Sequence, residues 1–370
     1  MQPDAVKYMK RALTLANKGV GKTSPNPAVG CVIVKNGTIV GEGWHRKAGG
    51  PHAEIHALEM AGIAARGSDV YVTLEPCCHT GKTPPCSEAL IKAGVQRVIA
   101  GMSDPNPQVS GGGLAALKQA GIRTVCGILE DACRAINLPF IKHVTTGIPY
   151  VTYKCAMTLD GSIATITGES RWISCEESRK YVHRMRARMD AVMVGVDTVI
   201  ADNPQLTVRH VRGKNPLRVI VDSRLRTPES VTVLSGRLAA KTIIATTESN
   251  PRVHLRYLNQ GVTILVCDEI DGHVSMQDLL QKLGAMGVQS ILLEGGSRLA
   301  GNMLQNGLID DLVFFVAPKI IGSDGFAPFS LSGLTSMDQA IRLLFTDVCR
   351  SGADLRVHAR PEGSHVHRID

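Results

Sequence analysis

The chain has 370 residues, of which 44% are hydrophobic and 20% are charged, and its formal net charge is +8 at pH 7. One hydrophobic core seldom organises a chain of this length, so two domains are expected. The N-terminal segment carries charges throughout, and no apolar run is long enough to cross a bilayer or to form the hydrophobic part of a signal peptide. We therefore expect a cytoplasmic protein with no membrane partner.

The positive charge could attract nucleic acid, but lysines and arginines are scattered among acidic residues rather than gathered into a basic block. Aromatic residues, on which bound bases usually stack, make up only 4% of the chain. A phosphorylated small molecule is the expected partner rather than a nucleic acid. We also expect self-association into a homo-oligomer.

The first part of the chain is predicted to be a compact α/β domain. Apolar residues at helical intervals predict an amphipathic helix over residues 4–17. Asn36-Gly37 suits the tight turn of a hairpin between strands at 29–34 and 38–40. Helices and short strands then alternate, with helices at 52–62, 86–93 and 111–120 and strands at 70–74, 95–100 and 122–126.

The alternation lapses over residues 137–149, where the domain boundary is expected. This divides the chain into a domain at 1–146, a second domain at 147–362 and a polar tail at 363–370 that we expect to be disordered. A capping box, Ser174-Cys-Glu-Glu177, predicts the start of a helix in the second domain. A mostly parallel sheet is expected there, with strands at 150–157, 191–195, 217–221, 242–245, 262–266, 290–293 and 311–316 and helices at 176–189, 276–286 and 297–306.

Ten cysteines are too few for a disulfide scaffold in a chain of this length, so metal ligation is the hypothesis to test. His52, Cys77 and Cys86 offer one imidazole and two thiolates. A zinc ion with three protein ligands keeps a fourth position for water, which is typical of a catalytic site. Glu54 is then free to transfer protons, and the expected chemistry is hydrolytic loss of ammonia from an aminated heterocycle.

Two alternatives remain open at this point. Cys78 could replace Cys77 as a ligand, although the Pro76-Cys77 dipeptide favours Cys77. Asn26, held between two prolines, could bind the edge of a pyrimidine or could simply occupy a turn.

The arrangement matches the His-x-Glu and Pro-Cys-x-x-Cys pattern of zinc nucleobase deaminases, except that eight residues rather than two separate the cysteines. The segments 76–86 and 23–31 closely resemble the deaminases of riboflavin biosynthesis. This resemblance implies a cytidine-deaminase-like domain. It also implies deamination of 2,5-diamino-6-(5-phosphoribosylamino)pyrimidin-4(3H)-one to 5-amino-6-(5-phosphoribosylamino)uracil.

The second domain has no Gly-x-Gly-x-x-Gly after a strand, so an ordinary Rossmann site is not supported. A glycine-rich turn at 293–302 follows an apolar run and opens a predicted helix, where backbone N–H groups favour phosphate. With the segments 154–161, 168–173 and 201–209, this turn resembles the reductases of the riboflavin pathway, which have a dihydrofolate-reductase-like fold. The resemblance implies reduction of ribosyl to ribityl by NADPH, although no 2′-phosphate pocket can be identified from spacing.

Carried over by position, the resemblance implies two sets of contacts. The NADPH set is Ala156, Trp172, Thr198, Asp202, Ser223, Gly296, Ser297, Arg298, Leu299, Ala300, Gly301 and Asn302. The substrate set is Ser170, Arg186, Leu206, Arg209 and Glu294, together with Asn26 in the first domain.

Arg186 and Arg209 could hold a ribose phosphate through bidentate bonds, and Glu294 could accept hydrogen bonds from sugar hydroxyls. Against this, Arg186 lies in a basic helix whose face could be solvated. Trp172 could belong to the core, and Lys154 could lie in solvent or beside the cofactor.

The expected function is therefore a bifunctional deaminase and reductase of riboflavin biosynthesis. One alternative is a tRNA or nucleoside deaminase with an accessory domain, which would share the zinc site. Another is a zinc-stabilised binding module without catalysis.

Overall fold

The computed structural model describes residues 3–79, 84–106 and 109–363. The chain separates into two compact units, Met1–Gly147 and Ile148–Asp370. Apart from Gly363, the predicted tail lies outside the described residues. Within the described part of the chain, no helix has the length and apolar character needed to span a membrane.

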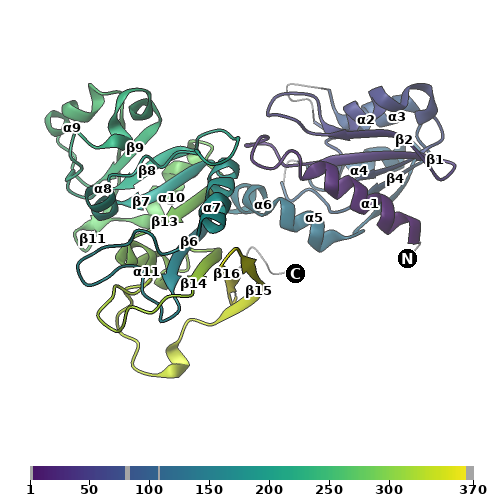
Figure 1. The fold of residues 1–370 in the computed structure, drawn as a ribbon. Helices are drawn as coiled ribbons and strands as arrows, with labels where there is room; N and C mark the ends of the chain where they lie inside the picture. The colour runs from purple at the N-terminus through teal and green to yellow at the C-terminus, as the bar shows by residue number, and fades with distance from the viewer. Residues whose placement is uncertain (1–2, 80–83, 107–108, 364–370) are drawn as a thin grey trace. The chain divides into compact units, whose positions relative to one another are not determined.

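The N-terminal unit contains a five-stranded sheet in the order β2-β1-β3-β4-β5 (Figure 1). β1 is antiparallel to β2 and β3, whereas β3, β4 and β5 are parallel. The predicted hairpin is present, with Asn36 and Gly37 at φ 52° and 77° in its turn. The strands are β1 (Gly30–Lys35), β2 (Thr38–Trp44), β3 (Asp69–Val72), β4 (Arg97–Ala100) and β5 (Arg123–Cys126).

Helices cover both faces of this sheet because side chains alternate along each strand. In β1, Cys31 and Ile33 pack with α2, α3 and α4, while Val32 and Val34 pack with α1, α5 and α6. The helices are α1 (Pro3–Ala16), α2 (Ala53–Ala61), α3 (Cys86–Ala93), α4 (Gly112–Gln119), α5 (Glu130–Ile136) and α6 (Leu138–Thr146), with a short 3₁₀ helix η1 (Gly62–Ala65) after α2.

Helix α6 lies where the alternation lapses and the domain boundary was expected, and it was not among the helices predicted from the sequence. Pro139 stands in the first turn of the helix, where a missing N–H costs no hydrogen bond. Just before it, the buried Asn137 side chain accepts a hydrogen bond from the Ala28 N–H (2.8 Å) and donates one to the Ala28 carbonyl (3.0 Å). These two bonds fix the end of the segment that contains Asn26.

The C-terminal unit contains a nine-stranded sheet in the order β10-β9-β8-β7-β13-β6-β14-β16-β15. The first seven are parallel, as predicted, and the last two pair antiparallel. The strands are β6 (Tyr150–Thr158), β7 (Ala191–Gly195), β8 (Leu217–Val221), β9 (Thr242–Thr246), β10 (Thr263–Val266), β13 (Ser290–Glu294), β14 (Asp311–Ala317), β15 (Leu343–Ser351) and β16 (Asp354–Pro361), and a separate hairpin pairs β11 (Glu269–Ile270) with β12 (His273–Val274).

Two helical layers enclose this sheet. α7, α8 and α9 pack on one face, and α10 and α11 pack on the other (Figure 1). The helices are α7 (Glu176–Arg188), α8 (Val196–Asp202), α9 (Pro251–Leu258), α10 (Met276–Ala285) and α11 (Ser297–Gln305), with 3₁₀ helices η2 (Thr232–Leu234), η3 (Gly236–Lys241) and η4 (Met337–Gln339).

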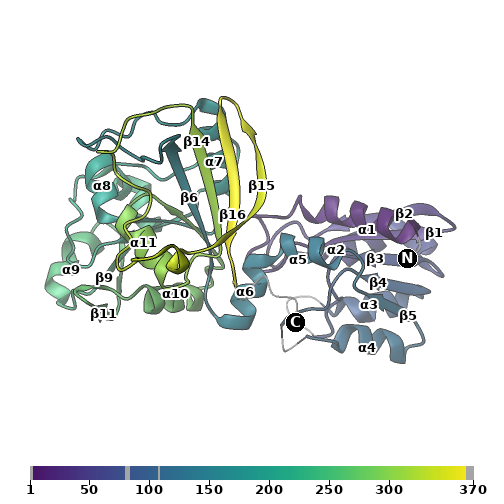
Figure 2. The ribbon, with the colours of Figure 1, turned by 90° about the horizontal axis from the view of Figure 1, so that it is seen from below.

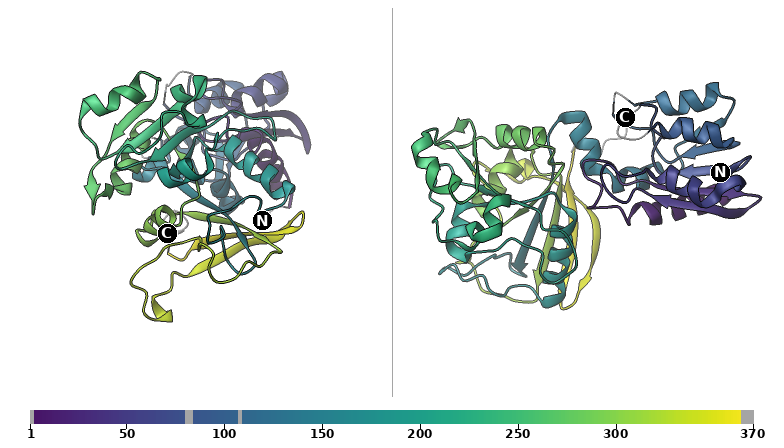
Figure 3. Two further views of the ribbon diagram at one scale, coloured as in Figure 1. Left: turned by 60° about the vertical axis from the view of Figure 1, so that its left-hand side comes forward. Right: turned by 90° about the horizontal axis from the view of Figure 1, so that it is seen from above.

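The sequence did not predict the hairpin of β15 and β16, which forms one edge of the sheet and is drawn in yellow (Figures 2 and 3). This hairpin also replaces the predicted capping box. Helix α7 begins after Cys175 with no side-chain cap, and the Cys175 N–H donates instead to Asp354 Oδ2 of β16 (2.9 Å). A tertiary partner has taken the place of the local serine cap.

Candidate active sites

Three side chains meet in the N-terminal unit, each at the end of an element. His52 precedes α2, Cys77 follows β3, and Cys86 begins α3. His52 Nδ1 lies 3.2 Å from Cys86 Sγ and 3.6 Å from Cys77 Sγ, and the three possible ligand atoms lie within 4.8 Å of one another.

This cluster fits a tetrahedral zinc ion. Ordinary Zn–N and Zn–S bond lengths place neighbouring ligand atoms about 3.6–3.8 Å apart. Hydrogen bonding from Cys86 and from His52 lowers the pKa of Cys77 to about 4, against the opposing effect of burial. Cys78 lies outside the cluster, with its Sγ beside the Val109 carbonyl. The geometry therefore favours Cys77 over Cys78 as a ligand.

Glu54 lies in the first turn of α2, two residues after His52, and is 3% exposed. Burial raises the pKa of its carboxyl to about 7. The close packing of α2 on β2 places this turn. A Cβ atom on Gly43 would lie 2.2 Å from the Ala53 carbonyl oxygen, so only glycine allows the helix to approach.

Glu75 lies two residues before the metal ligand Cys77, and sequence reasoning assigned it no function. Its buried carboxyl group accepts four backbone hydrogen bonds, from Asp104 (3.1 Å), Gly111 (3.0 Å), Gly113 (3.0 Å) and Leu114 (3.1 Å). Two of these donors belong to the first turn of α4, where N–H groups lack partners within the helix. One carboxyl group thus connects the segment before Cys77 to Asp104 and to the start of α4.

Asn26 is connected to the same cluster through His45. The Pro51 carbonyl can only accept, so the His45 Nδ1, 3.0 Å away, carries the proton. Nε2 then accepts from the Asn26 amide at 3.1 Å. Burial lowers the pKa of His45, and its ring lies edge-on to that of His52, with centroids 5.2 Å apart. Asn26 therefore has a fixed amide near the cluster.

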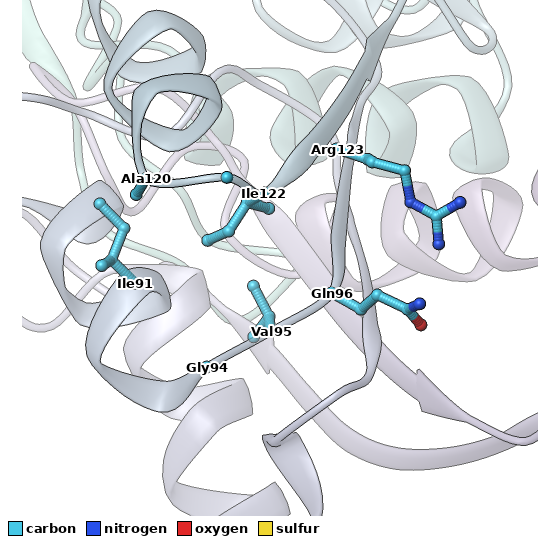
Figure 4. A pocket seen from close by; sticks show the side chains of 8 residues that line it. Ile91, Gly94, Val95, Gln96, Ala120, Ile122 and Arg123 are labelled. Carbon is cyan, nitrogen blue, oxygen red and sulfur yellow. The ribbon is translucent and has the colours of Figure 1, made fainter.

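A depression of about 570 Å³ lies at the amino-terminal ends of β4 and β5 in the same sheet (Figure 4). Ile91, Val95 and Ile122 line it together with Gln96 and Arg123, all from segments that precede or begin β4 and β5. The metal cluster lies beyond the carboxyl end of β3. Because β3 runs parallel to β4, this is the opposite end of the strands from the depression. This depression is therefore separate from the metal cluster.

In the C-terminal unit, three positions of the predicted cofactor set, Thr198, Ser223 and Gly296, lie beyond the carboxyl ends of parallel strands. Sheet order changes direction between β7 and β13, and such a point commonly forms a ligand crevice. Thr198 follows β7, and a Cβ atom on Gly295, after β13, would lie 3.1 Å from its hydroxyl. Ser223 follows β8 and accepts from the Val274 N–H (3.0 Å), and Ala156 is half-buried in β6.

The predicted turn at 296–302 is only partly available to a ligand. Gly296 precedes α11 with φ 75°, and Arg298 is strongly exposed. Leu299, Ala300 and Gly301 instead pack inward, and a Cβ atom on Gly301 would lie 2.2 Å from the Ser330 carbonyl oxygen. The remaining members of the turn are Ser297, whose carbonyl accepts from the Ser330 N–H, and Asn302, which is exposed.

Arg186, which was expected to hold a ribose phosphate, is paired with Glu294 in the structure. Its guanidinium makes a bidentate pair with Glu294 at 2.6 and 2.9 Å, and Nη1 donates to the Thr207 carbonyl (3.0 Å). Both side chains are nearly buried, at 12% and 11% exposure, so Arg186 is not on a solvated face either. Burial disfavours the charge on Glu294, but Arg186 and Lys154 outweigh it and lower its pKa. Lys154 lies beside this pair, because it is the register partner of Glu294 on the neighbouring strand β6.

Arg209 is exposed, and its guanidinium donates hydrogen bonds to the neutral side chains of Gln205 and Thr207. Its backbone N–H donates to His183 Nδ1 (3.1 Å). Burial, followed by the nearby Arg186, lowers the pKa of His183 to about 4. Sequence reasoning did not single out His183 as a residue of this site, because no motif surrounds it in the sequence.

The other predicted residues differ in exposure. Trp172 is 63% exposed and lies under the guanidinium of Arg179, 4.6 Å from the ring centroid, so it is not a core residue. Leu206 is 3% exposed with φ 53°, so only its backbone could face a ligand. Ser170 is half-buried in a loop, and Asp202 ends α8.

Substituting Glu75→Gln tests the support of the metal cluster. A glutamine keeps one acceptor oxygen but turns an amide NH₂ toward two of the four N–H donors. We expect the free energy of unfolding to fall by about 2–4 kcal/mol, measured by urea denaturation, and zinc affinity to fall in chelator competition. Glu88→Gln, an exposed change on α3, should alter neither, and equal behaviour of the two variants would contradict this function of Glu75.

Comparisons with known proteins agree with this geometry. Residues 3–102 match the family described as cytidine and deoxycytidylate deaminase zinc-binding region, and residues 149–357 match the RibD C-terminal domain. The riboflavin biosynthesis protein RibD of Actinobacillus pleuropneumoniae is 46% identical over 94% of this chain and 93% of its own length. That of Escherichia coli is 42% identical over 95% and 98%.

Solved structures give the same result over both units. Acinetobacter baumannii RibD is 40% identical, with a TM-score of 0.88 over 97% of this chain and 99% of its own. The Thermotoga maritima diaminohydroxyphosphoribosylaminopyrimidine deaminase/5-amino-6-(5-phosphoribosylamino)uracil reductase is 37% identical, with a TM-score of 0.86 and the same coverage. The α/β fold and the resemblance inferred from sequence are confirmed, and the chain belongs to the RibD family of riboflavin biosynthesis proteins.

Proposed function

We propose that this chain is a bifunctional enzyme that deaminates 2,5-diamino-6-(5-phosphoribosylamino)pyrimidin-4(3H)-one and then reduces the ribosyl group of the product to ribityl with NADPH. The observation that carries the first activity is the His52, Cys77 and Cys86 cluster with Glu54 buried at its side. The second activity is supported by the grouping of Thr198 and the glycine turn at the change of strand order.

In the deaminase unit, His52, Cys77 and Cys86 would hold zinc, which when bound makes water nucleophilic at neutral pH. Glu54 takes a proton from the attacking water and returns one to the departing ammonia. Asn26, held by His45, presents its free amide atoms to the pyrimidine edge. Burial of Glu54 excludes bulk water from this proton transfer.

In the reductase unit, NADPH would supply the hydride when bound. Its cradle is formed by Ala156, Thr198, Ser223, Trp172, Asp202 and the open part of the 296–302 turn. The exposed charge of Arg209 suits the substrate phosphate, with Ser170 and the Leu206 backbone beside it. Glu294 is oriented by Arg186 rather than by solvent, and it accepts hydrogen bonds from sugar hydroxyls.

The alternatives from the sequence are less well supported. A tRNA or nucleoside deaminase would have no use for an acidic residue and an arginine paired at a second crevice, such as Glu294 and Arg186. A non-catalytic zinc module would have no use for Glu54. The substrate is a small metabolite, and we place the enzyme in the cytoplasm.

Glu54→Gln tests the first activity. We expect ammonia release to fall at least about 100-fold, because proton transfer is lost while the metal ligands remain. Zinc content should stay stoichiometric, and NADPH oxidation with the deaminated intermediate should be unchanged. Glu59→Gln on the exposed side of the same helix is the matched control. Full ammonia release from Glu54→Gln would reject the assignment.

We also propose that the enzyme is a homo-oligomer associated through the edge strand β15. Leu344, Phe345 and Val348 are 55%, 73% and 57% exposed on this strand, whose outer edge pairs with no other described strand. Phe345→Asp should convert the oligomer to monomers in sedimentation analysis, whereas Ile63→Asp, a change at an exposed residue of the other unit, should not. A monomeric parent protein would contradict the proposal.

A further inference from the structure

A buried histidine on α7 holds the loop that contains Arg209, and the proposed function gives this histidine no part. His183 is 5% exposed, and its Nδ1 accepts a hydrogen bond from the Arg209 N–H at 3.1 Å. Arg186, one turn later on the same helix, donates from Nη1 to the Thr207 carbonyl at 3.0 Å. Two side chains of one helix therefore fix both ends of the segment 207–209.

The backbone that follows also lies tightly against α7. A Cβ atom on Gly213 would lie 2.4 Å from the Ala187 Cβ, so only glycine allows the loop to approach the helix this closely. Within the loop, the Val208 N–H donates to Asn215 Oδ1 at 2.8 Å. The exposed side chain of Arg209 therefore starts from a fixed backbone.

The guanidinium of Arg209 is oriented by neutral groups. Its Nη1 donates to Gln205 Oε1 at 3.2 Å and to Thr207 Oγ1 at 3.3 Å. The Nε and Nη2 N–H groups form the other side of an arginine fork, the side that pairs with two oxygens of a phosphate. The two contacts thus direct the guanidinium without cancelling its charge.

His183 supplies its acceptor without adding a negative charge. Because the Arg209 N–H donates to Nδ1, the ring carries its proton on Nε2. Burial, followed by the nearby Arg186, lowers the pKa of His183 to about 4, so the ring is neutral near pH 7. The ring of His210, the next residue of the loop, lies edge-on to it with the centroids 4.6 Å apart. A carboxylate in this place would pair with an arginine and compete with a phosphate.

We propose that His183 is a positioning residue of the reductase unit, which places Arg209 so that its guanidinium meets the 5′-phosphate of the ribosyl group. His183 acts through the backbone of Arg209 and not by contact with the substrate. The inference rests on the proposed binding of that phosphate by Arg209. It extends the substrate site to a residue outside the contacts expected from the sequence.

Steady-state NADPH oxidation by the full-length chain with the deaminated intermediate, together with calorimetric titration with NADPH, tests this function. His183→Leu removes the acceptor, and we expect KM for the intermediate to rise about tenfold, a typical loss for one hydrogen bond to a charged group, with kcat and the Kd for NADPH within about twofold of the parent values. His183→Asn, whose Oδ1 can replace Nδ1 as acceptor, should restore the parent KM.

A double-mutant cycle shows whether His183 acts through Arg209. Arg209→Gln alone should raise KM, and adding His183→Leu to it should raise KM no further. His254→Leu is the matched control, because it removes the hydrogen bond of a similarly buried histidine, 2.8 Å from the Glu248 carbonyl, and should leave KM unchanged.

Each other outcome is decisive. Independent, multiplying effects of the two substitutions, or equal losses in KM, kcat and NADPH binding that asparagine does not restore, would make His183 a structural residue only and overturn the proposal. Unchanged KM in His183→Leu would also overturn it. Unchanged KM in Arg209→Gln would reject the phosphate site itself, and the inference with it. If His183→Leu does not fold, His183→Gln, whose amide lies one bond farther from the backbone, takes its place in the same cycle.

Discussion

Parallel strands bring their carboxyl ends to one edge of a sheet, and both sites of this chain depend on that constraint. In the N-terminal unit, Glu75 and Cys77 leave β3 at the same edge at which Asp104 follows β4. In the C-terminal unit, the residues after β7, β8 and β13 meet in the same manner. Residues far apart in sequence therefore reach one crevice without long connections.

A buried carboxyl group is the second feature that the two sites share, and the two groups have different hydrogen-bond partners. Glu75 is satisfied by four backbone N–H donors, which fixes a segment of chain. Glu294 is satisfied by the fork of Arg186, which fixes one side chain by another. An unpaired buried carboxylate would be costly in either place. Glu54, by contrast, is left with a raised pKa, as suits a group that exchanges protons.

The features that could be predicted from the sequence are those that a local pattern of residues determines. Helix termini and paired motifs were sufficient to identify His52, Cys77, Cys86 and the parallel strands. Pairing between distant residues could not be predicted, because Arg186 and Glu294 are 108 positions apart and each has several plausible uses. The capping box failed for the same reason, since Asp354 supplied a tertiary partner for helix α7. The β15 and β16 hairpin was not predicted, because β15 is mostly exposed and β16 mostly half-buried, so neither strand has the continuous burial that produces an apolar run.

The most direct test of the bifunctional account follows both products of one reaction mixture. Purified zinc-loaded protein is given the diaminopyrimidine ribosyl phosphate and NADPH, and ammonia and oxidised NADPH are counted over time. The account predicts one NADPH oxidised for each ammonia released, with oxidation lagging behind deamination. Ammonia release without NADPH oxidation would contradict the assignment of the C-terminal unit, and absence of both products would contradict the account as a whole.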